Sequence, residues 1–111
     1  MSDIVKTEII DNVALLTLND PDRLNALSLD MIAELHKNII LINNGEIKAR
    51  CLVITGAGRG FCAGANLIEG AGKSSFEDID PGKALEEHYH PFLVDLKNIK
   101  IPLITAVNGV A

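Results

Sequence analysis

The sequence predicts an α/β fold, and three observations support that prediction. Two runs of β-branched residues and leucines, over residues 4–10 and 13–18, are separated only by Asp11-Asn12. A longer stretch then carries apolar residues at helical spacing, and a short apolar run follows it at residues 51–55. Strands interleaved with helices are typical of α/β domains. The 111 residues have room for one small domain, and a hydrophobic content of 48% is enough for a core.

The first half of the chain predicts a β-hairpin and one helix. The two apolar runs are expected to pair around the turn residues Asp11-Asn12. Ser28 is a good N-cap, and we expect a helix from there to about residue 43, closed by Gly45. The apolar residues at helical spacing are Leu29, Met31, Ile32, Leu35, Ile39, Ile40 and Ile42.

The middle of the chain predicts a strand followed by a glycine-rich loop. Residues 51–55 are apolar between basic residues and glycine, which favours a strand buried on both faces. Most of the nine glycines then fall between positions 56 and 72. Such a concentration indicates unusual backbone dihedrals or a close approach to another group.

The last third predicts a polar surface segment over residues 73–80, a helix and another buried strand over 101–107. Asp80-Pro81 suits the start of the helix, and Pro91 is expected to kink it or to remove one backbone hydrogen bond. The apolar face of this helix should consist of Leu85, Tyr89, Phe92, Leu93 and Leu96.

Charge and composition exclude several classes of function. Ten Lys and Arg against fifteen Asp and Glu give a net charge of -5, which disfavours binding to nucleic acid or anionic lipid. No apolar stretch approaches the roughly twenty residues that span a bilayer, and the first residues have no signal core. Two cysteines, Cys51 and Cys62, are too few for a disulfide scaffold. We therefore expect a cytoplasmic protein without nucleic-acid or membrane partners.

The strongest local motif is the segment of small residues at 58–67, directly after the strand at 51–55. A ligand could lie against its main chain, and a short helix beginning near Ala65 would direct backbone N–H groups at an anion or a developing oxyanion. A tight strand-to-helix turn that needs glycine for geometry alone explains the same residues. The residues themselves leave both interpretations open.

Other motifs are weaker. Gly58, Gly60 and Ala63 satisfy a loose dinucleotide fingerprint, but the acidic residue required about twenty positions later is missing. His88 and His90 would point to different faces of a helix, so no metal site is expected. Cys62 beside the glycines is either an activated thiolate or a small packed residue.

Three segments together resemble the crotonase (enoyl-CoA hydratase/isomerase) family. Residues 60–65, after the strand and glycine at 52–56, resemble its first oxyanion-hole signature. Residues 18–27 resemble its coenzyme A-binding loop, and residues 101–111 resemble the strand and turn that lead to its second oxyanion-hole motif. The segments occur in family order and spacing. One departure is Asn66, where family members usually have aspartate.

The resemblance implies a site made largely of backbone. Ala65 would donate its N–H to the thioester carbonyl of the substrate. Arg23 would help to hold the nucleotide and pantetheine portions of coenzyme A, although its side chain is equally explained as a solvated charge. The residues implied to contact coenzyme A are Arg23, Leu24, Ala26, Ala63, Gly64, Ala65, Asn66 and Leu67.

The implied fold is a crotonase-like (ClpP/crotonase) spiral of ββα units, with residues 1–111 as the N-terminal part of one domain and the C-terminal half absent. The implied reaction is hydration of 2-enoyl-CoA thioesters through a stabilised enolate. Double-bond isomerisation is the alternative, because residues 85–92 resemble a helix of the family's phenylacetyl-CoA-pathway isomerases.

Further implications concern the substrate and the assembly. Coenzyme A enters as part of an acyl-CoA substrate, no cofactor or metal is permanently bound, and the full-length protein would form a homotrimer or hexamer. Because the second oxyanion donor and the proton-transferring residues would lie beyond residue 111, the chain alone is expected to be inactive. A non-catalytic remnant, or a small α/β domain without an acyl-CoA ligand, are the alternatives from other classes.

Overall fold

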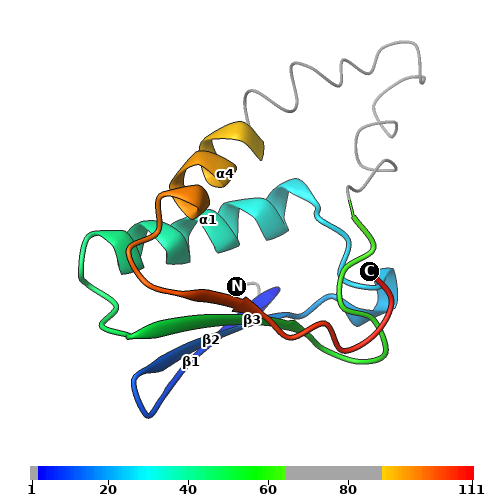
Figure 1. Cartoon of the computed structure of the whole chain (residues 1–111). Coiled ribbons are helices and arrows are strands. Elements are labelled where there is room, and N and C mark those ends of the chain that lie inside the picture. The colour runs from blue at the N-terminus through cyan, green and yellow to red at the C-terminus, as the bar shows by residue number, and fades with distance from the viewer. Residues whose placement is uncertain (1–2, 65–88) are drawn as a thin grey trace.

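The computed structural model describes residues 3–64 and 89–111, and this part of the chain forms one α/β layer structure (Figure 1). Its strands form a four-stranded sheet in the order β1-β2-β3-β4, in which only the first pair is antiparallel. Both helices lie on one side of the sheet (Figure 1). In chain order the elements are β1 (Val5–Ile10), β2 (Val13–Leu18), the 3-10 turn η1 (Pro21–Arg23), α1 (Leu29–Asn43), β3 (Cys51–Gly56), α4 (His90–Lys97) and β4 (Leu103–Thr105).

The predicted hairpin is confirmed. Strands β1 and β2 pair from Ile10 opposite Val13 to Val5 opposite Leu18. Asp11 and Asn12 have φ values of 49° and 68°, so both turn residues are left-handed. Positive φ at both central residues matches the right-handed twist of the strands, which explains why Asp and Asn stand there.

The predicted first helix is also confirmed. The Ser28 hydroxyl accepts a hydrogen bond from the Met31 amide at 3.1 Å and so caps the first turn. After Asn43 the chain reaches Gly45 at φ 85°, and the Gly45 amide donates to the Ile42 carbonyl at 3.2 Å. A left-handed glycine is the usual way to end a helix.

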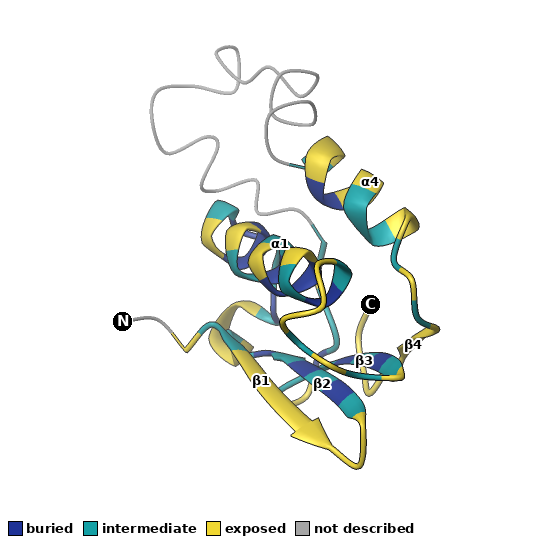
Figure 2. Cartoon of the chain, turned by 90° about the vertical axis from the view of Figure 1, so that its left-hand side faces the viewer, coloured by how far each residue is buried: buried dark blue, intermediate teal, exposed yellow. Residues whose placement is uncertain are grey.

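The hydrophobic core lies between α1 and the sheet. One face of α1 is buried, and it packs on the residues of β2 and β3 that point toward the helix (Figure 2). Since successive strand residues point to opposite faces, the buried positions alternate. The core residues are Ala14, Leu16, Leu18, Met31, Ile32, Leu35, Ile39, Ile42, Leu52, Ile54 and Phe92.

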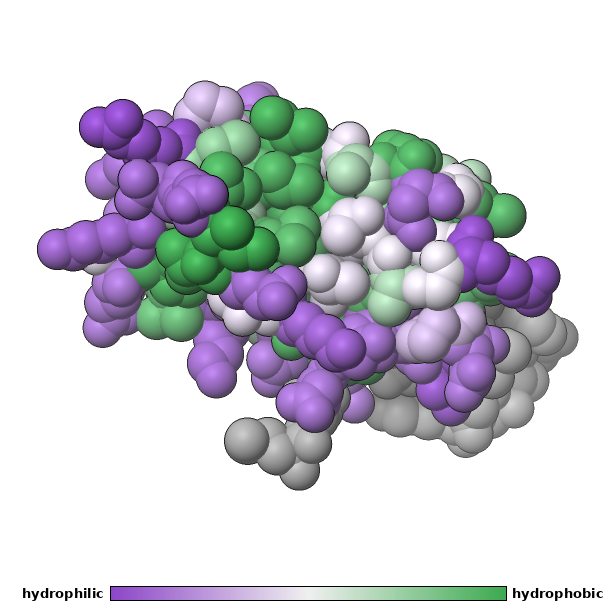
Figure 3. All heavy atoms as spheres, turned by 90° about the horizontal axis from the view of Figure 1, so that it is seen from below, coloured by the Kyte–Doolittle hydropathy of each residue, from purple (hydrophilic) through white to green (hydrophobic). Residues whose placement is uncertain are grey.

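Burial of β3 on both faces was a wrong prediction for the described residues. Leu52 and Ile54 are buried, whereas Val53 between them is only partly buried. The reason is that α1 and α4 cover one face of the sheet. On the other face Leu15, Val53 and Ile104 lie in register across three strands, and the surface there is broadly apolar (Figure 3).

The second predicted helix is described only from His90 onward. The polar segment 73–80, the expected helix start at Asp80-Pro81 and Leu85 lie outside the described residues. Pro91 stands in the first turn of α4, a position where proline is common. Tyr89, just before α4, also has right-handed helical backbone (φ -81°, ψ -43°), and the residues before it lie outside the described ranges, so the predicted kink stays a prediction.

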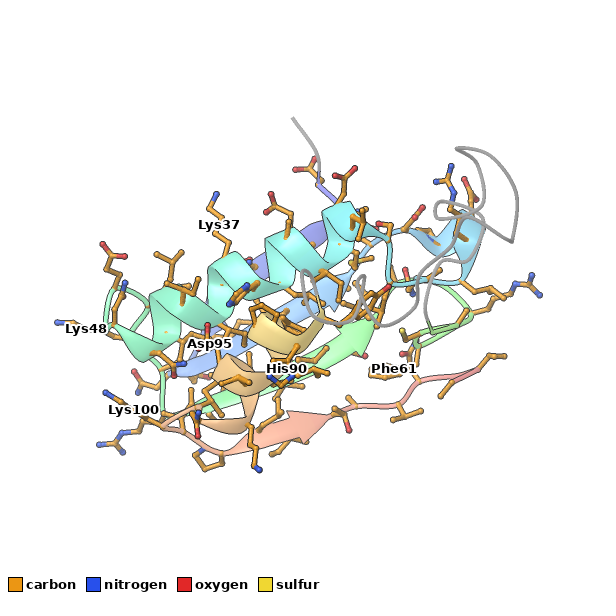
Figure 4. The ribbon with its side chains drawn as sticks, turned by 90° about the horizontal axis from the view of Figure 1, so that it is seen from above. Lys37, Lys48, Phe61, His90, Asp95 and Lys100 are labelled. Atoms are coloured by element: carbon orange, nitrogen blue, oxygen red, sulfur yellow. The ribbon has the colours of Figure 1, made fainter. Side chains whose placement is uncertain are left out.

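Contacts with α1 determine which face of α4 is buried. Phe92 is 5% exposed, but Leu93 is 47% exposed, so its assignment to the apolar face was wrong. Asp95 also faces α1 (Figure 4), and its carboxylate lies 2.6 Å from Nε2 of His36. The Asn43 side-chain amide donates to the Asp95 backbone carbonyl at 3.2 Å. Leu93 lies outside this set of contacts, which explains its exposure.

The strand at the end of the chain is shorter and more exposed than predicted. Strand β4 has three residues instead of the expected seven, and Ile104 is 53% exposed. Pro102 has no N–H to contribute to a ladder, although its carbonyl accepts from the Leu52 amide at 2.9 Å. After Ala106 the chain leaves the sheet edge and runs beside the loop that follows β3 (Figure 1).

Candidate functional site

The glycine-rich loop begins where β3 ends, at Gly56, and is described as far as Gly64. Its first turn is attached to β2, because the Ala57 amide donates to the Leu18 carbonyl at 2.8 Å. Gly58 and Gly64 have φ values of 77° and 93°. Those conformations are easily reached only by glycine. The sequence prediction of unusual dihedrals in this loop is thus confirmed.

Close packing of backbone is the second reason for glycine here. A Cβ on Gly56 would lie 2.5 Å from the carbonyl oxygens of both Gly60 and Phe61. A Cβ on Gly60 would lie 3.2 Å from the Leu24 side chain. The loop therefore folds back on itself and on the segment around Leu24. Phe61 lies just past the tip of β3 (Figure 4).

The segment after β2 lies beside the glycine-rich loop. Pro21–Arg23 make one 3-10 turn, and Leu24 and Asn25 follow with φ values of 51° and 56°. Two consecutive left-handed residues reverse the chain before the Ser28 cap of α1. The Ala26 amide donates to the Arg23 carbonyl at 3.1 Å, which closes this reversal.

The structure brings the two predicted loops together through their backbones. The Ala63 amide donates to the Leu24 carbonyl at 2.9 Å, and the Leu27 amide donates to the Gly64 carbonyl at 2.7 Å. Leu24, Ala26, Ala63 and Gly64 thus belong to one joined pair of loops, although about forty positions separate them in the sequence.

Other predicted site residues are placed differently. Arg23 is peripheral: its side chain is 69% exposed and lies 3.4 Å from Asp20. Its geometry is that of a solvated charge with a weak local ion pair. Ala65, Asn66 and Leu67 lie outside the described residues.

The last residues of the chain also contact the glycine-rich loop. The Phe61 and Cys62 amides both donate to the Val110 carbonyl, at 2.8 Å and 3.1 Å. Gly109 lies so close to the loop that a Cβ on it would be 2.1 Å from the Arg59 carbonyl oxygen. The segment 106–111 and the glycine-rich loop therefore fix each other.

Two asparagines complete the site, and the sequence analysis missed both. Asn25 has no exposed surface and bonds to the glycine-rich loop from one side. Asn108 bonds to Gly56 and Gly58 from the other side. Their residue type could have indicated this role, because asparagine adopts left-handed backbone conformations in loops and its side chain carries both hydrogen-bond donors and an acceptor.

The described part of the site is built mainly from backbone groups, and its two arginines, Arg23 and Arg59, are both exposed. Among residues 3–64 and 89–111, no group of three or more His, Cys, Asp or Glu side chains could hold a metal ion. Cys62 is a free, partly buried thiol packed against the core. No helix within the same ranges has the length and hydropathy to cross a bilayer. Strand-end loops with close backbone approach suit a ligand that is held by main-chain groups.

The comparisons identify the family. The sequence model of the enoyl-CoA hydratase/isomerase family matches residues 8–111. The chain belongs to this family, and its fold is the α/β fold of crotonase-type enzymes. The resemblance of the three sequence segments is thereby confirmed at the level of the family.

Individual relatives agree with the family match. The chain is 37% identical to the 1,2-epoxyphenylacetyl-CoA isomerase of Escherichia coli over all of its own length and 42% of that protein. It is 35% identical to the probable enoyl-CoA hydratase of Rhodobacter capsulatus, over 96% of this chain and 39% of the relative. The enoyl-CoA hydratase structure from Bacillus anthracis superposes with a TM-score of 0.82 at 29% identity, over 97% of this chain and 41% of that one. The chain thus spans about two fifths of the length of these relatives.

Proposed function

We propose that the domain containing these residues hydrates 2-enoyl-CoA thioesters. The observation that carries the proposal is the joining of the two loops by the hydrogen bonds Ala63 to Leu24 and Leu27 to Gly64. These bonds place the segment leading into Ala65 beside the segment proposed to hold coenzyme A. A thioester bound along both loops would have its carbonyl close to the Ala65 amide.

In the proposed mechanism, water adds to the β-carbon of the enoyl thioester and a proton is delivered to the α-carbon. Negative charge develops on the thioester oxygen in the intervening enolate. A backbone N–H aimed at that oxygen stabilises the transition state more than the ground state, which accelerates the reaction. The Ala65 amide is the proposed donor on this chain.

Coenzyme A would run along the joined loops. We assign its contacts to Leu24, Ala26, Ala63 and Gly64, with Asn66 and Leu67 continuing the same path. The left-handed reversal at Leu24 keeps this segment against the glycine-rich loop. Arg23 is exposed at the outer end, where a solvated guanidinium can meet a phosphate group of the nucleotide.

Double-bond isomerisation is the second candidate. The match to the Escherichia coli 1,2-epoxyphenylacetyl-CoA isomerase covers the whole chain at 37% identity, which favours it. Isomerisation would use the same enolate stabilisation, but without addition of water. The two reactions therefore share the loop residues and differ in the groups that move protons.

The test is turnover by the protein produced from its own gene, assayed separately with a 2-enoyl-CoA and a 3-enoyl-CoA. Hydration of the first supports the proposal, and conversion of the second without hydration supports isomerisation. Ala65→Pro, which removes the N–H, should lower turnover by about a hundredfold or more, whereas Ala65→Gly, which retains it, should not. Equal turnover in Ala65→Pro and Ala65→Gly would show that the Ala65 N–H does not take part in the mechanism.

We further propose that the 111 residues alone do not catalyse the reaction, because the relatives that match are more than twice as long. Turnover by the purified 111-residue chain would contradict this.

We also assign the protein to the cytoplasm, in keeping with the free thiols of Cys51 and Cys62. A homotrimer or hexamer is the assembly we propose for the whole protein, and light scattering of that protein tests it.

A further inference from the structure

Asn25 is a fully buried polar residue at the junction of the two loops. Its exposed fraction is 0%, and its backbone is left-handed with φ 56°. A buried side-chain amide costs free energy unless its N–H₂ and its oxygen both find partners. The contacts of Asn25 therefore determine what it does in the fold.

Among the described residues, the contacts of the Asn25 amide lie between the two loops or within the reversal that carries it. The amide nitrogen donates to the Ala57 carbonyl at 3.0 Å and to the Gly60 carbonyl at 2.9 Å. The amide oxygen accepts from the Asp20 backbone N–H at 2.8 Å. One planar side chain thus connects the start and the middle of the glycine-rich loop to the segment before α1.

The packing leaves little freedom for this connection to shift. A Cβ on Gly56 would lie 2.8 Å from the side-chain amide nitrogen of Asn25, so the loop backbone packs directly against that amide. The neighbouring residue Leu24 provides the carbonyl that accepts from the Ala63 amide. A displacement of Asn25 would therefore move both the glycine-rich loop and its attachment at Ala63.

A second asparagine holds the loop from the opposite side but in a different setting. Asn108 donates to the Gly56 and Gly58 carbonyls at 2.8 Å and 3.3 Å, and it is exposed. Hydrogen bonds in a solvated position exchange with water at low cost, whereas those of a buried amide do not. Asn25 is accordingly the more rigid of the two supports.

We propose that Asn25 is a positioning residue for the reaction: it fixes residues 56–64 of the glycine-rich loop, along which the thioester is proposed to bind. This inference rests on the proposed function, because it assigns Asn25 a role in that same site. Asn25 acts through the loop and does not touch the reacting atoms. A misplacement of about 1 Å in a group that positions the substrate can cost about a hundredfold in rate.

The decisive variant is Asn25→Asp in the protein produced from its own gene. Aspartate has the same shape and keeps an oxygen for the Asp20 amide, but it presents an oxygen to the Ala57 and Gly60 carbonyls in place of the N–H₂ donors. Asn25→Gly is the second variant, to be used if the buried charge prevents folding. Glycine tolerates φ 56° and removes the side chain without adding a charge.

Asn38→Asp is the matched control. Asn38 is 7% exposed on α1, its amide nitrogen donates to the Glu34 carbonyl at 2.9 Å, and its oxygen accepts from the Thr7 hydroxyl at 2.9 Å. The control substitution therefore disturbs a buried asparagine of the same kind, but one that has no contact with either loop.

Two readouts separate a positioning role from a structural one. In Asn25→Asp we expect kcat to fall about a hundredfold with a much smaller change in KM, and the amides of residues 57–64 to exchange with solvent faster. Asn38→Asp should keep wild-type kcat and loop exchange at a similar loss of Tm. Equal kcat in the two variants, or unchanged loop exchange in Asn25→Asp, would overturn the inference. If the wild-type protein turns over no enoyl-CoA, the proposed function fails, and the exchange measurement still decides whether Asn25 holds the loop.

Discussion

The two ends of the described structure, the body and the loop end, are each stabilised by a different kind of interaction. The body, made of the sheet and α1, is stabilised by apolar side chains that recur at regular spacing. The loop end, made of residues 20–27, 56–64 and 106–111, is held by backbone hydrogen bonds and by two asparagine side chains. Apolar burial supplies most of the folding free energy, whereas precise hydrogen bonds fix geometry. The body should therefore set stability, and the loop end should set turnover.

Leu16→Ala in the body is the substitution with the largest expected effect on stability. Leu16 is fully buried under α1, and truncation should reduce the free energy of unfolding by about 2–5 kcal/mol. Urea denaturation measures the loss, and kcat of the folded fraction should be unchanged. Ile10→Ala is the control, because Ile10 is 53% exposed and should cost far less. A large fall in kcat for Leu16→Ala would show that the body also controls turnover, which contradicts the assignment of turnover to the loop end.

Gly56→Ala at the loop end should lower turnover as well as stability. The added Cβ would lie 2.5 Å from two carbonyl oxygens, so the loop must shift. We expect a loss of about 1–3 kcal/mol in stability and about a hundredfold in kcat. Gly45→Ala is the matched control, because Gly45 is also at a structural turn but has no atom within 4 Å of the added Cβ. If both variants keep wild-type kcat, the loop geometry does not control turnover.

Ser28→Ala tests the junction between the two ends. The Ser28 hydroxyl caps α1, while the preceding Leu27 amide bonds to the Gly64 carbonyl. Loss of the cap should cost about 1 kcal/mol, measured as a lower urea midpoint, and Ser28→Asp should restore most of it because aspartate is also a good cap. A selective loss of activity without a change in stability would place Ser28 in the functional site instead.

Arg23→Ala should have the smallest effect on stability. The ion pair of Arg23 with Asp20 is long and mostly solvated, so removal should change the free energy of unfolding by less than about 1 kcal/mol. If Arg23 meets a phosphate of coenzyme A, KM should rise a few-fold at low salt, and the rise should shrink as salt increases. Arg23→Lys should retain most of the binding. An unchanged KM at low salt would leave Arg23 as a solvated charge.

The elements of the body were predictable because their signals are local. The hairpin follows from Asp11-Asn12 between two apolar runs, and α1 follows from the Ser28 cap and the helical spacing. The burial of β3 and β4 was predicted wrongly, since it depends on which face the helices cover and which strand lies at the sheet edge. Neither is encoded in the run of apolar residues itself.

The loop end was only partly predictable. The resemblance to the family predicted that residues 18–27 and 60–65 share one site, and this assignment stays a prediction. The structure shows that the two loops are hydrogen-bonded, Ala63 to Leu24 and Leu27 to Gly64. The role of Asn25 could not be read from the sequence, because its partners Ala57 and Gly60 lie 32 and 35 positions away. Every residue has a backbone carbonyl, so the residue type of the acceptor does not reveal that it takes part in such a hydrogen bond. Only the fold shows that these groups meet.

The central claim is that a backbone donor held by the loop end polarises a thioester carbonyl. Difference infrared spectroscopy of a saturated acyl-CoA, labelled with ¹³C at the thioester carbonyl and bound to the protein produced from its own gene, tests this directly. We expect the carbonyl stretch to move to lower frequency on binding, and the shift to become smaller in Asn25→Asp. A bound carbonyl with the same frequency as in water would contradict it.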